Sequence, residues 1–273
     1  MKEKFVIRKL KQLSRKLGHR LVDATVPADI FVELLKYRDS GEATSKSQDH
    51  DLLGYMIRHF NESSAQIFQD LWVLFMTREK HDGFFVEFGA TNGMTLSNTL
   101  LLERDFGWKG ILAEPARGWH DELRQNRKCI IDTRCVWSRS GEVLEFNEVA
   151  EGELSTIGKF SDSDGHAKSR KLSKTYTVES ISLEDLLVAH NAPHCIDYLS
   201  VDTEGSELTI LSNFDFSKYD IRFITVEHNY TPERKKIHTL LRQNGYTRIF
   251  EGFSQWDDWY VKADPVLREP VPN

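Results

Sequence analysis

The clearest pattern along the chain is a pair of short apolar runs separated by a glycine turn and a helical stretch. The runs are Phe84–Phe88 and Ile111–Ala113, the turn spans Gly89–Gly93, and Thr95–Phe106 has apolar residues at helical spacing. Glu114 closes the second run. The order strand, glycine turn, helix, strand and acid predicts the opening unit of a doubly wound sheet that binds a nucleotide-like ligand.

The alternation of strand-like and helix-like stretches continues along the rest of the chain. The predicted strands are Cys129–Trp137, Glu142–Val149, Tyr176–Ile181, Ile196–Val201, Phe223–Val226, Arg248–Phe250 and Trp259–Val261. The predicted helices are Ala116–Arg127, Glu207–Leu211, Pro232–Asn244 and a stretch that Ser182 caps and His190 ends. Since strands that alternate with helices form mainly parallel sheets, we predict an α/β fold. Ligands of such sheets bind past the carboxyl ends of the strands.

The first 80 residues read as a helical extension that caps the sheet or supports oligomerisation. An amphipathic stretch, Ala28–Arg38, is followed by a polar segment, Asp39–Asp51, which we interpret as a loop. Helical patterning resumes over Leu52–Arg78. We therefore divide the chain into an extension (1–80), a ligand-binding domain (81–263) and a tail (264–273).

Two glycines and two acids indicate how the predicted turn binds its ligand. Gly89 and Gly93 permit a tight turn and a close approach of the backbone to a ligand. Glu114 is placed to accept hydrogen bonds from ribose hydroxyls. The spacing G-x-x-x-G lacks the third glycine of the dinucleotide pattern, and Glu87 would repel a pyrophosphate but suit a cationic ligand. These features favour a nucleoside that carries an amino acid. A nicotinamide-dependent oxidoreductase on the same topology is the alternative.

Three predicted strand ends carry polar residues that should meet at one edge of the sheet. They are Glu87 with Gly89, Asp202 with Glu204, and Glu227 with His228 and Asn229. His228 is our first candidate for a general base, because its ordinary pKa lies near neutrality. Asp202 is the second candidate. A structural, hydrogen-bonded histidine is the alternative interpretation of His228.

Several of these segments together resemble a known enzyme family. VEFGATNGMTLSNT, GILAEP, LSVDTEGSEL and ITVEHN occur in this order and are similar to the FkbM-type methyltransferases, a branch of the class I S-adenosylmethionine-dependent enzymes. The resemblance spans roughly residues 62–262 and implies a seven-stranded Rossmann-like sheet. It also implies methyl transfer to a hydroxyl of a sugar, glycan or other small molecule. A non-catalytic relative that kept the fold is a further alternative.

The resemblance extends the set of residues that we expect to bind S-adenosylmethionine. Side chains in and after the glycine turn could hold the cofactor carboxylate, or they could be ordinary helix caps. The expected cofactor-binding residues are Glu87, Gly89, Ala90, Asn92, Gly93, Ser97, Glu114 and Pro115.

A metal ion is a second way to activate the acceptor hydroxyl. Asp202 and Glu227, with Glu204 or Asn229, offer the oxygen ligands that Mg²⁺ prefers. The alternative is that Asp202 and Glu204 only cap the turn at Gly205 and the helix after it.

Two further groups of residues are ambiguous. Gln66 and Asp70 lie one helical turn apart and could reach the cofactor, or they could belong to a plain exposed face. Trp256 and Trp259 could stack on a sugar, but aromatic residues near strands are more often core, and we assign them no role.

Composition and charge limit the possible partners. The 273 residues are 40% hydrophobic and carry a net charge of −6, which does not suggest a nucleic-acid surface. No apolar run approaches membrane-span length, and the N-terminus lacks the apolar core of a signal peptide, so we expect a cytoplasmic protein.

The first 20 residues differ from the rest in charge. They contain eight Lys or Arg and one Glu, and leucines recur at helical spacing. Residues 2–20 could contact an anionic membrane surface or a partner protein. A solvated first helix packed through its leucines is the alternative.

Overall fold

The computed structural model describes residues 47–148, 156–157 and 174–263. Several predictions lie outside these residues: the basic segment 2–20, the amphipathic stretch 28–38, most of the predicted loop 39–51 and the tail 264–273. Within the described part, no helix is both long enough and apolar enough to cross a membrane.

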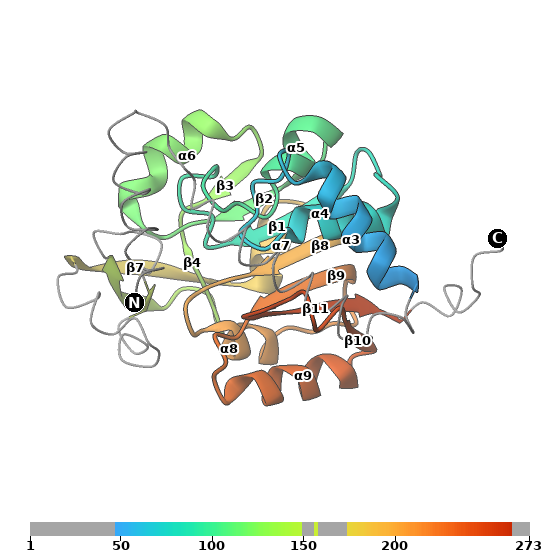
Figure 1. Cartoon of the computed structure of the whole chain (residues 1–273). Coiled ribbons are helices and arrows are strands. Elements are labelled where there is room, and N and C mark those ends of the chain that lie inside the picture. Colours follow the sequence, from blue (N-terminus) through green and yellow to red (C-terminus); the bar gives the residue numbers. More distant parts are fainter. Residues whose placement is uncertain (1–46, 149–155, 158–173, 264–273) are drawn as a thin grey trace, which may run out of the picture.

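The core of the fold is a seven-stranded sheet (Figure 1). Its order is β10-β11-β9-β8-β1-β2-β3, and β11 runs in the direction opposite to the other six strands. This order confirms the predicted doubly wound, mostly parallel sheet. The strands are β1 (Phe84–Phe88), β2 (Lys109–Ala113), β3 (Ile130–Asp132), β8 (Cys195–Val201), β9 (Asp220–Glu227), β10 (Tyr246–Ile249) and β11 (Asp257–Lys262).

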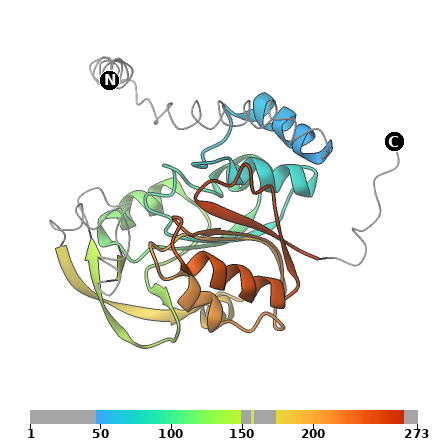
Figure 2. The ribbon, with the colours of Figure 1, turned by 60° about the horizontal axis from the view of Figure 1, so that its bottom comes forward.

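Helices cover both faces of this sheet, as Figures 1 and 2 show. One apolar core lies between the sheet and α3 to α6, and the other lies between the sheet and α7 to α9. Trp72 and Trp259 stack in the first core with ring centroids 5.0 Å apart, so Trp259 is a core residue. The helices are α3 (Ser47–His59), α4 (Gln69–Thr77), α5 (Leu100–Phe106), α6 (His120–Asn126), α7 (Leu183–Ala189), α8 (Glu207–Ser212) and α9 (Glu233–Gln243).

The predicted strand 129–137 is divided between the main sheet and a second sheet of four strands. The Asp132 carboxylate accepts a hydrogen bond from the Arg134 backbone N–H at 2.9 Å, and this turn divides the predicted strand 129–137. The chain then enters a sheet of order β4-β7-β5-β6. Its strands are β4 (Cys135–Trp137), β5 (Val143–Glu148), β6 (Thr156–Ile157) and β7 (Lys174–Ser182).

Helix boundaries account for the other differences from the sequence predictions. Residues 47–51 begin α3, so the loop prediction was wrong for them, and the helical pattern over 52–78 is interrupted between α3 and α4. The helix predicted from Thr95 begins only at Leu100, because the side chains and backbone of residues 97–99 bond to Glu87 instead. The predicted cap is confirmed: the Ser182 hydroxyl accepts a hydrogen bond from the Asp185 N–H at 3.1 Å.

Candidate active site

Strand register brings the predicted residues to one edge of the sheet. Phe88 pairs with Ala113, which sets Gly89 beside Glu114. Glu87 pairs with Ser200, and Val201 pairs with Val226, so Asp202 lies between the glycine turn and Glu227. The convergence of these strand ends is therefore confirmed. It falls where the strand order reverses, between β1 and its two neighbours β2 and β8, which is where doubly wound sheets bind ligands.

A cavity of about 370 Å³ opens at this edge, within the range of small-molecule sites. It extends from the glycine turn, past the ends of β2 and β4, to the ends of β8 and β9. Among the described residues, its lining contains four carboxylates and no Lys, Arg or His. The cavity therefore favours a cationic or neutral ligand over an anion.

The two glycines of the turn are required for different reasons. Gly89 has a φ of +71°, and a Cβ there would lie 2.2 Å from the Asp202 carbonyl oxygen. Gly89 thus allows the turn to approach the end of β8. Gly93 has a φ of +76°, and its Cβ would lie 2.6 Å from side-chain atoms of both Leu123 and Arg127. We predicted that Gly93 lets the backbone approach a ligand. Instead, the missing Cβ leaves space for the Arg127 side chain, and Gly93 does not line the cavity.

Glu114 occupies the position predicted for a ribose-binding acid. Its Oε2 accepts a hydrogen bond from the Thr91 N–H at 2.8 Å, and its Oε1 accepts one from the Ala116 N–H at 2.7 Å. Burial raises the pKa of Glu114 to about 7 despite these two bonds. Each oxygen retains a lone pair for a ligand hydroxyl. Ala90 and Pro115, also expected at the cofactor, line the same cavity.

Glu87 does not face the cavity, contrary to our prediction. Its carboxylate accepts hydrogen bonds from the Asn98 N–H at 2.8 Å and from the hydroxyls of Ser97 and Thr99. The Arg127 guanidinium lies 3.8 Å away. Glu87 therefore stabilises the chain at residues 97–99 from the side away from the cavity. Because its carboxylate does not face the cavity, it does not select between a pyrophosphate and a sulfonium ligand.

The two polar residues predicted to hold the cofactor carboxylate have different positions. Asn92 does not line the cavity: its Oδ1 accepts hydrogen bonds from the N–H groups of Met94 at 3.0 Å and Thr95 at 2.9 Å, and so it stabilises its own turn. Ser97 does line the cavity, although its hydroxyl is already bonded to Glu87 and Arg127.

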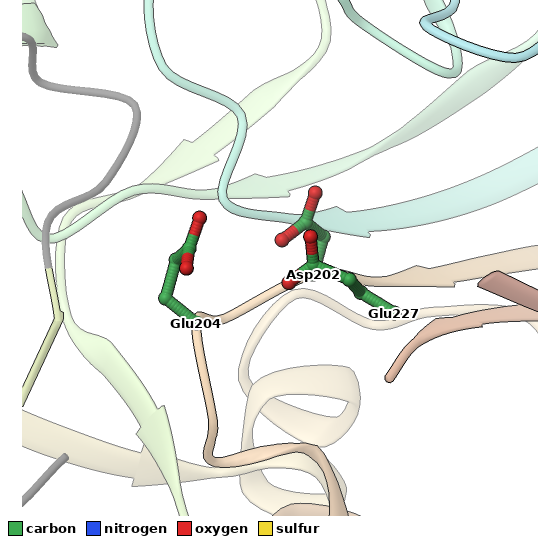
Figure 3. Close-up of side chains that lie close together, drawn as sticks. All are labelled: Asp202, Glu204 and Glu227. Carbon is green, nitrogen blue, oxygen red and sulfur yellow. The ribbon is translucent and has the colours of Figure 1, made fainter. Parts of the chain in front are cut away.

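Three carboxylates form the acidic end of the cavity. One oxygen from each of Asp202, Glu204 and Glu227 lies within 4.8 Å of the others. Figure 3 shows Asp202 and Glu227 close together and Glu204 on the loop that follows β8. Burial, together with the neighbouring negative charges, raises the pKa of Asp202 and of Glu227 above the ordinary carboxyl range. Glu204 has a φ of +56°, a conformation that proteins concentrate at functional sites.

His228 lies behind the cavity wall rather than in it. Its Nδ1 accepts a hydrogen bond from the Tyr230 N–H at 3.0 Å, and its Nε2 lies 3.6 Å from an Asp258 carboxylate oxygen. Burial lowers the pKa of the ring. A neutral ring that accepts through Nδ1 stabilises the turn to Tyr230, and it has no exposed nitrogen aimed at an acceptor. Asp202, our second candidate, does line the cavity.

Three wall residues had different standings in the sequence analysis: Gln66 was either a cofactor contact or part of an exposed face, Tyr230 was missed, and Trp256 was assigned no role. Gln66, Tyr230 and Trp256 line the cavity, and the Trp256 Nε1–H donates a hydrogen bond to the Gln66 Oε1 at 3.3 Å. Tyr230 is 65% exposed, and its backbone has a φ of +57°. No local pattern marks Tyr230, because its turn depends on His228. Asp70 is fully buried and bonded to Ser63 and Ser64.

The fold and the site together define a class I methyltransferase architecture, with an acid at the end of the second strand and a glycine turn at the switch point. A family model described as the methyltransferase FkbM domain matches residues 87–258. The chain belongs to this methyltransferase family. It is therefore a methyltransferase, and S-adenosylmethionine is the cofactor that its fold implies.

Similar solved structures are distant. They include precorrin-6y C5,15-methyltransferase from Geobacter metallireducens GS-15, at 11% identity and a TM-score of 0.38, over 70% of this chain and 85% of that one. The METTL16 MTase domain has 12% identity and a TM-score of 0.38, over 70% of this chain and 63% of that one. A human methyltransferase 10 domain containing protein has 13% identity and a TM-score of 0.34, over 70% and 78% of the two chains. No curated protein matches the chain.

Proposed function

We propose that the protein is an S-adenosylmethionine-dependent O-methyltransferase that acts on a hydroxyl group of a sugar or glycan. One observation carries the proposal: a partly buried carboxylate, Asp202, lies directly between the glycine turn at Gly89 and a second carboxylate, Glu227, in a single cavity. An acceptor and a cofactor bound side by side there would both touch the end of β8.

The residues of the cofactor half suit a sulfonium nucleoside. Glu114 offers acceptor lone pairs at the end of β2, and Gly89 removes the Cβ that would separate the turn from β8. The carboxylates of the cavity stabilise positive charge. When bound, S-adenosylmethionine supplies a methyl group that is activated by its attachment to a sulfonium.

Asp202 is suited to accept the proton that the hydroxyl loses as its oxygen is methylated. A general base works best when its pKa lies near the operating pH, and burial moves the pKa of Asp202 in that direction. Such a base contributes about 10²–10⁴-fold to the rate. The negative charge of Glu207 also raises the pKa of Asp202, whereas the hydrogen bond between Asp202 and Glu227 lowers it.

The acceptor half combines aromatic and hydrogen-bonding groups. Tyr230 and Trp256 offer apolar ring surface, while Gln66 and Asn229 offer amide groups on the same wall. A sugar ring has an apolar face and a polar rim, so it matches this combination of side chains. This match supports a carbohydrate acceptor.

A divalent metal ion at the acid cluster would fit the same reaction. Asp202, Glu204 and Glu227 would hold it, and carboxylate oxygens are the donors that Mg²⁺ and Ca²⁺ prefer. Such an ion would lower the pKa of an acceptor hydroxyl bound to it. No Lys or Arg is among the described residues that line the cavity, so a cation would also offset the charge of the cluster.

The test is incubation with labelled S-adenosylmethionine and a panel of glycans, free sugars and nucleotide sugars, with and without a chelator. Asp202→Asn should reduce methyl transfer by roughly 10²–10⁴-fold. Asp121→Asn is the matched control, because Asp121 has a 96% exposed side chain on α6 and should keep the wild-type rate. An Asp202→Asn rate within a few-fold of wild type would refute the assigned base.

Thermal melts distinguish the rival functions. S-adenosylmethionine should raise the melting temperature, since a ligand that binds only the folded state stabilises it. NAD should have no effect. Stabilisation by NAD alone would favour an oxidoreductase, and binding of S-adenosylmethionine without transfer to any hydroxyl in the panel would favour a non-catalytic relative.

A further inference from the structure

The loop that joins β1 to α5 has a defined shape without regular secondary structure. It spans residues 89–99, and α5 begins only at Leu100. Thr91 and Leu96 have φ values of +46° and +59°, in the left-handed region that non-glycine residues avoid. The loop nevertheless supplies much of the cofactor half of the cavity, so other contacts must hold it.

Arg127, at the end of α6, makes those contacts from behind the loop. Its side chain is fully buried. Its Nη1 donates hydrogen bonds to the Gly93 carbonyl oxygen at 3.2 Å and to the Ser97 hydroxyl at 3.0 Å, and its Nη2 donates one to the Thr99 hydroxyl at 2.9 Å. One planar guanidinium therefore fixes three separate points of the loop, which a lysine ammonium cannot do at the same spacing.

Two acidic residues and a glycine hold the Arg127 side chain in this position. Glu103 on α5 accepts a hydrogen bond from its Nε at 2.5 Å, and Glu87 on β1 lies 3.8 Å from its Nη1. Although burial raises the pKa of Glu103, the charge of Arg127 holds it below its usual value. A Cβ at Gly93 would lie 2.6 Å from the Arg127 Cγ. The second glycine of the turn motif thus leaves space for the arginine.

We propose that Arg127 is a positioning residue that sets the shape of loop 89–99 for the amino-acid end of S-adenosylmethionine, and that Gly93 is glycine to admit it. The inference rests on the proposed function. Arg127 does not line the cavity and acts through Ser97 and its neighbours. If its loss leaves the loop in the binding shape for about a tenth of the time, the apparent Kd rises about tenfold.

The experiment measures calorimetric binding of S-adenosylhomocysteine and amide hydrogen exchange of the loop in the full chain. Arg127→Met should raise the Kd about tenfold and speed exchange at residues 95–99, and Arg127→Lys should lie between it and wild type. Lys80→Met is the matched control: it removes a cation from a buried partner, Asp197, at 2.7 Å and far from the loop. It should leave both the Kd and the loop exchange unchanged.

A second variant separates positioning from charge balance. Arg127→Met leaves the buried Glu87 and the partly buried Glu103 without their cation and could unfold the protein for that reason alone. The triple variant with Arg127→Met, Glu87→Gln and Glu103→Gln removes this charge, so its folding should recover while its Kd stays high.

The outcomes are distinct. Wild-type affinity in folded Arg127→Met, or restored affinity in the triple variant, would overturn the inference. If wild type itself does not bind S-adenosylhomocysteine, the proposed function is wrong, and the positioning role of Arg127 is then judged from hydrogen exchange of the loop alone. Unchanged protection of the loop in Arg127→Met would then overturn the positioning role.

Discussion

Replacing Gly89 with alanine tests the contact on which the site geometry depends. Gly89 and Gly245 both have left-handed backbones, with φ values of +71° and +86°. A Cβ at Gly89 would lie 2.2 Å from the Asp202 carbonyl oxygen, whereas a Cβ at Gly245 meets no atom within 4 Å. Gly245→Ala is therefore a control that carries the backbone strain of Gly89→Ala without its steric clash.

The expected loss of unfolding free energy follows from the backbone strain and the steric clash. The left-handed conformation costs a non-glycine residue about 1–2 kcal/mol, and both variants incur this cost. Overpacking adds about 1–3 kcal/mol for Gly89→Ala alone. Relief of the clash requires the turn and the end of β8 to separate by close to 1 Å, and a misplacement of about 1 Å can cost about 10² in rate.

The assay is urea denaturation of wild type and both variants, followed by calorimetric titration with S-adenosylhomocysteine. Gly245→Ala should lose about 1–2 kcal/mol of unfolding free energy and bind as wild type does. Gly89→Ala should lose roughly 2–5 kcal/mol and bind far more weakly. Equal stability and equal affinity in the two variants would show that the turn and β8 do not need to touch.

Three further predictions concern the acids and the histidine. Because the pKa of Glu114 is raised, its protonated form stabilises the fold below about pH 4.5, and roughly 3 kcal/mol of this stability is lost as the pH rises through about 7. Glu114→Gln should therefore flatten the pH dependence of the unfolding free energy in urea over this range, and it should weaken cofactor binding. His228→Ala should lose about 1–3 kcal/mol of unfolding free energy, because the Tyr230 N–H loses its acceptor, and its affinity for S-adenosylhomocysteine should stay near wild type. If the variant instead kept its stability and its methyl-transfer rate fell about 10²-fold, His228 would be the base after all. Mg²⁺ or Ca²⁺ at pH 8 should raise the melting temperature of wild type and not of Glu204→Gln, and equal shifts in both would place the ion elsewhere.

The strands of the sheet could be predicted because their apolar runs are buried on both faces. Phe84–Phe88 coincides with β1, and the order of strands and helices was enough to place Asp202 near Gly89 and Glu227. The switch point follows from topology alone. This part of the site depends on the register of the strands, which follows from where the apolar runs begin and end.

Contacts between distant residues account for what the sequence did not predict. The start of α5 was placed too early because Ser97 and Thr99 bond to Glu87, a residue ten or more positions away. His228 was assigned to the cavity because its strand ends there. Its ring direction depends on Asp258 and on the Tyr230 turn, and neither leaves a local signal.

Charge compensation separates the buried acids of this protein into two groups. Glu87, Asp197 and Asp258 each lie within 4 Å of an Arg or Lys, and each ties together segments that are distant in the sequence. Glu114 and Glu227 are equally buried, yet no Lys or Arg pairs with them among the described residues. A buried carboxylate without a cation is costly unless other contacts satisfy it, as the hydrogen bonds from Ser63 and Ser64 do for Asp70. Glu114 and Glu227 differ from Asp70 because they line the cavity, where a bound group can supply a further benefit. A cationic cofactor, a metal ion or a transferred proton each supplies that benefit, and all three act at the cavity where these acids lie.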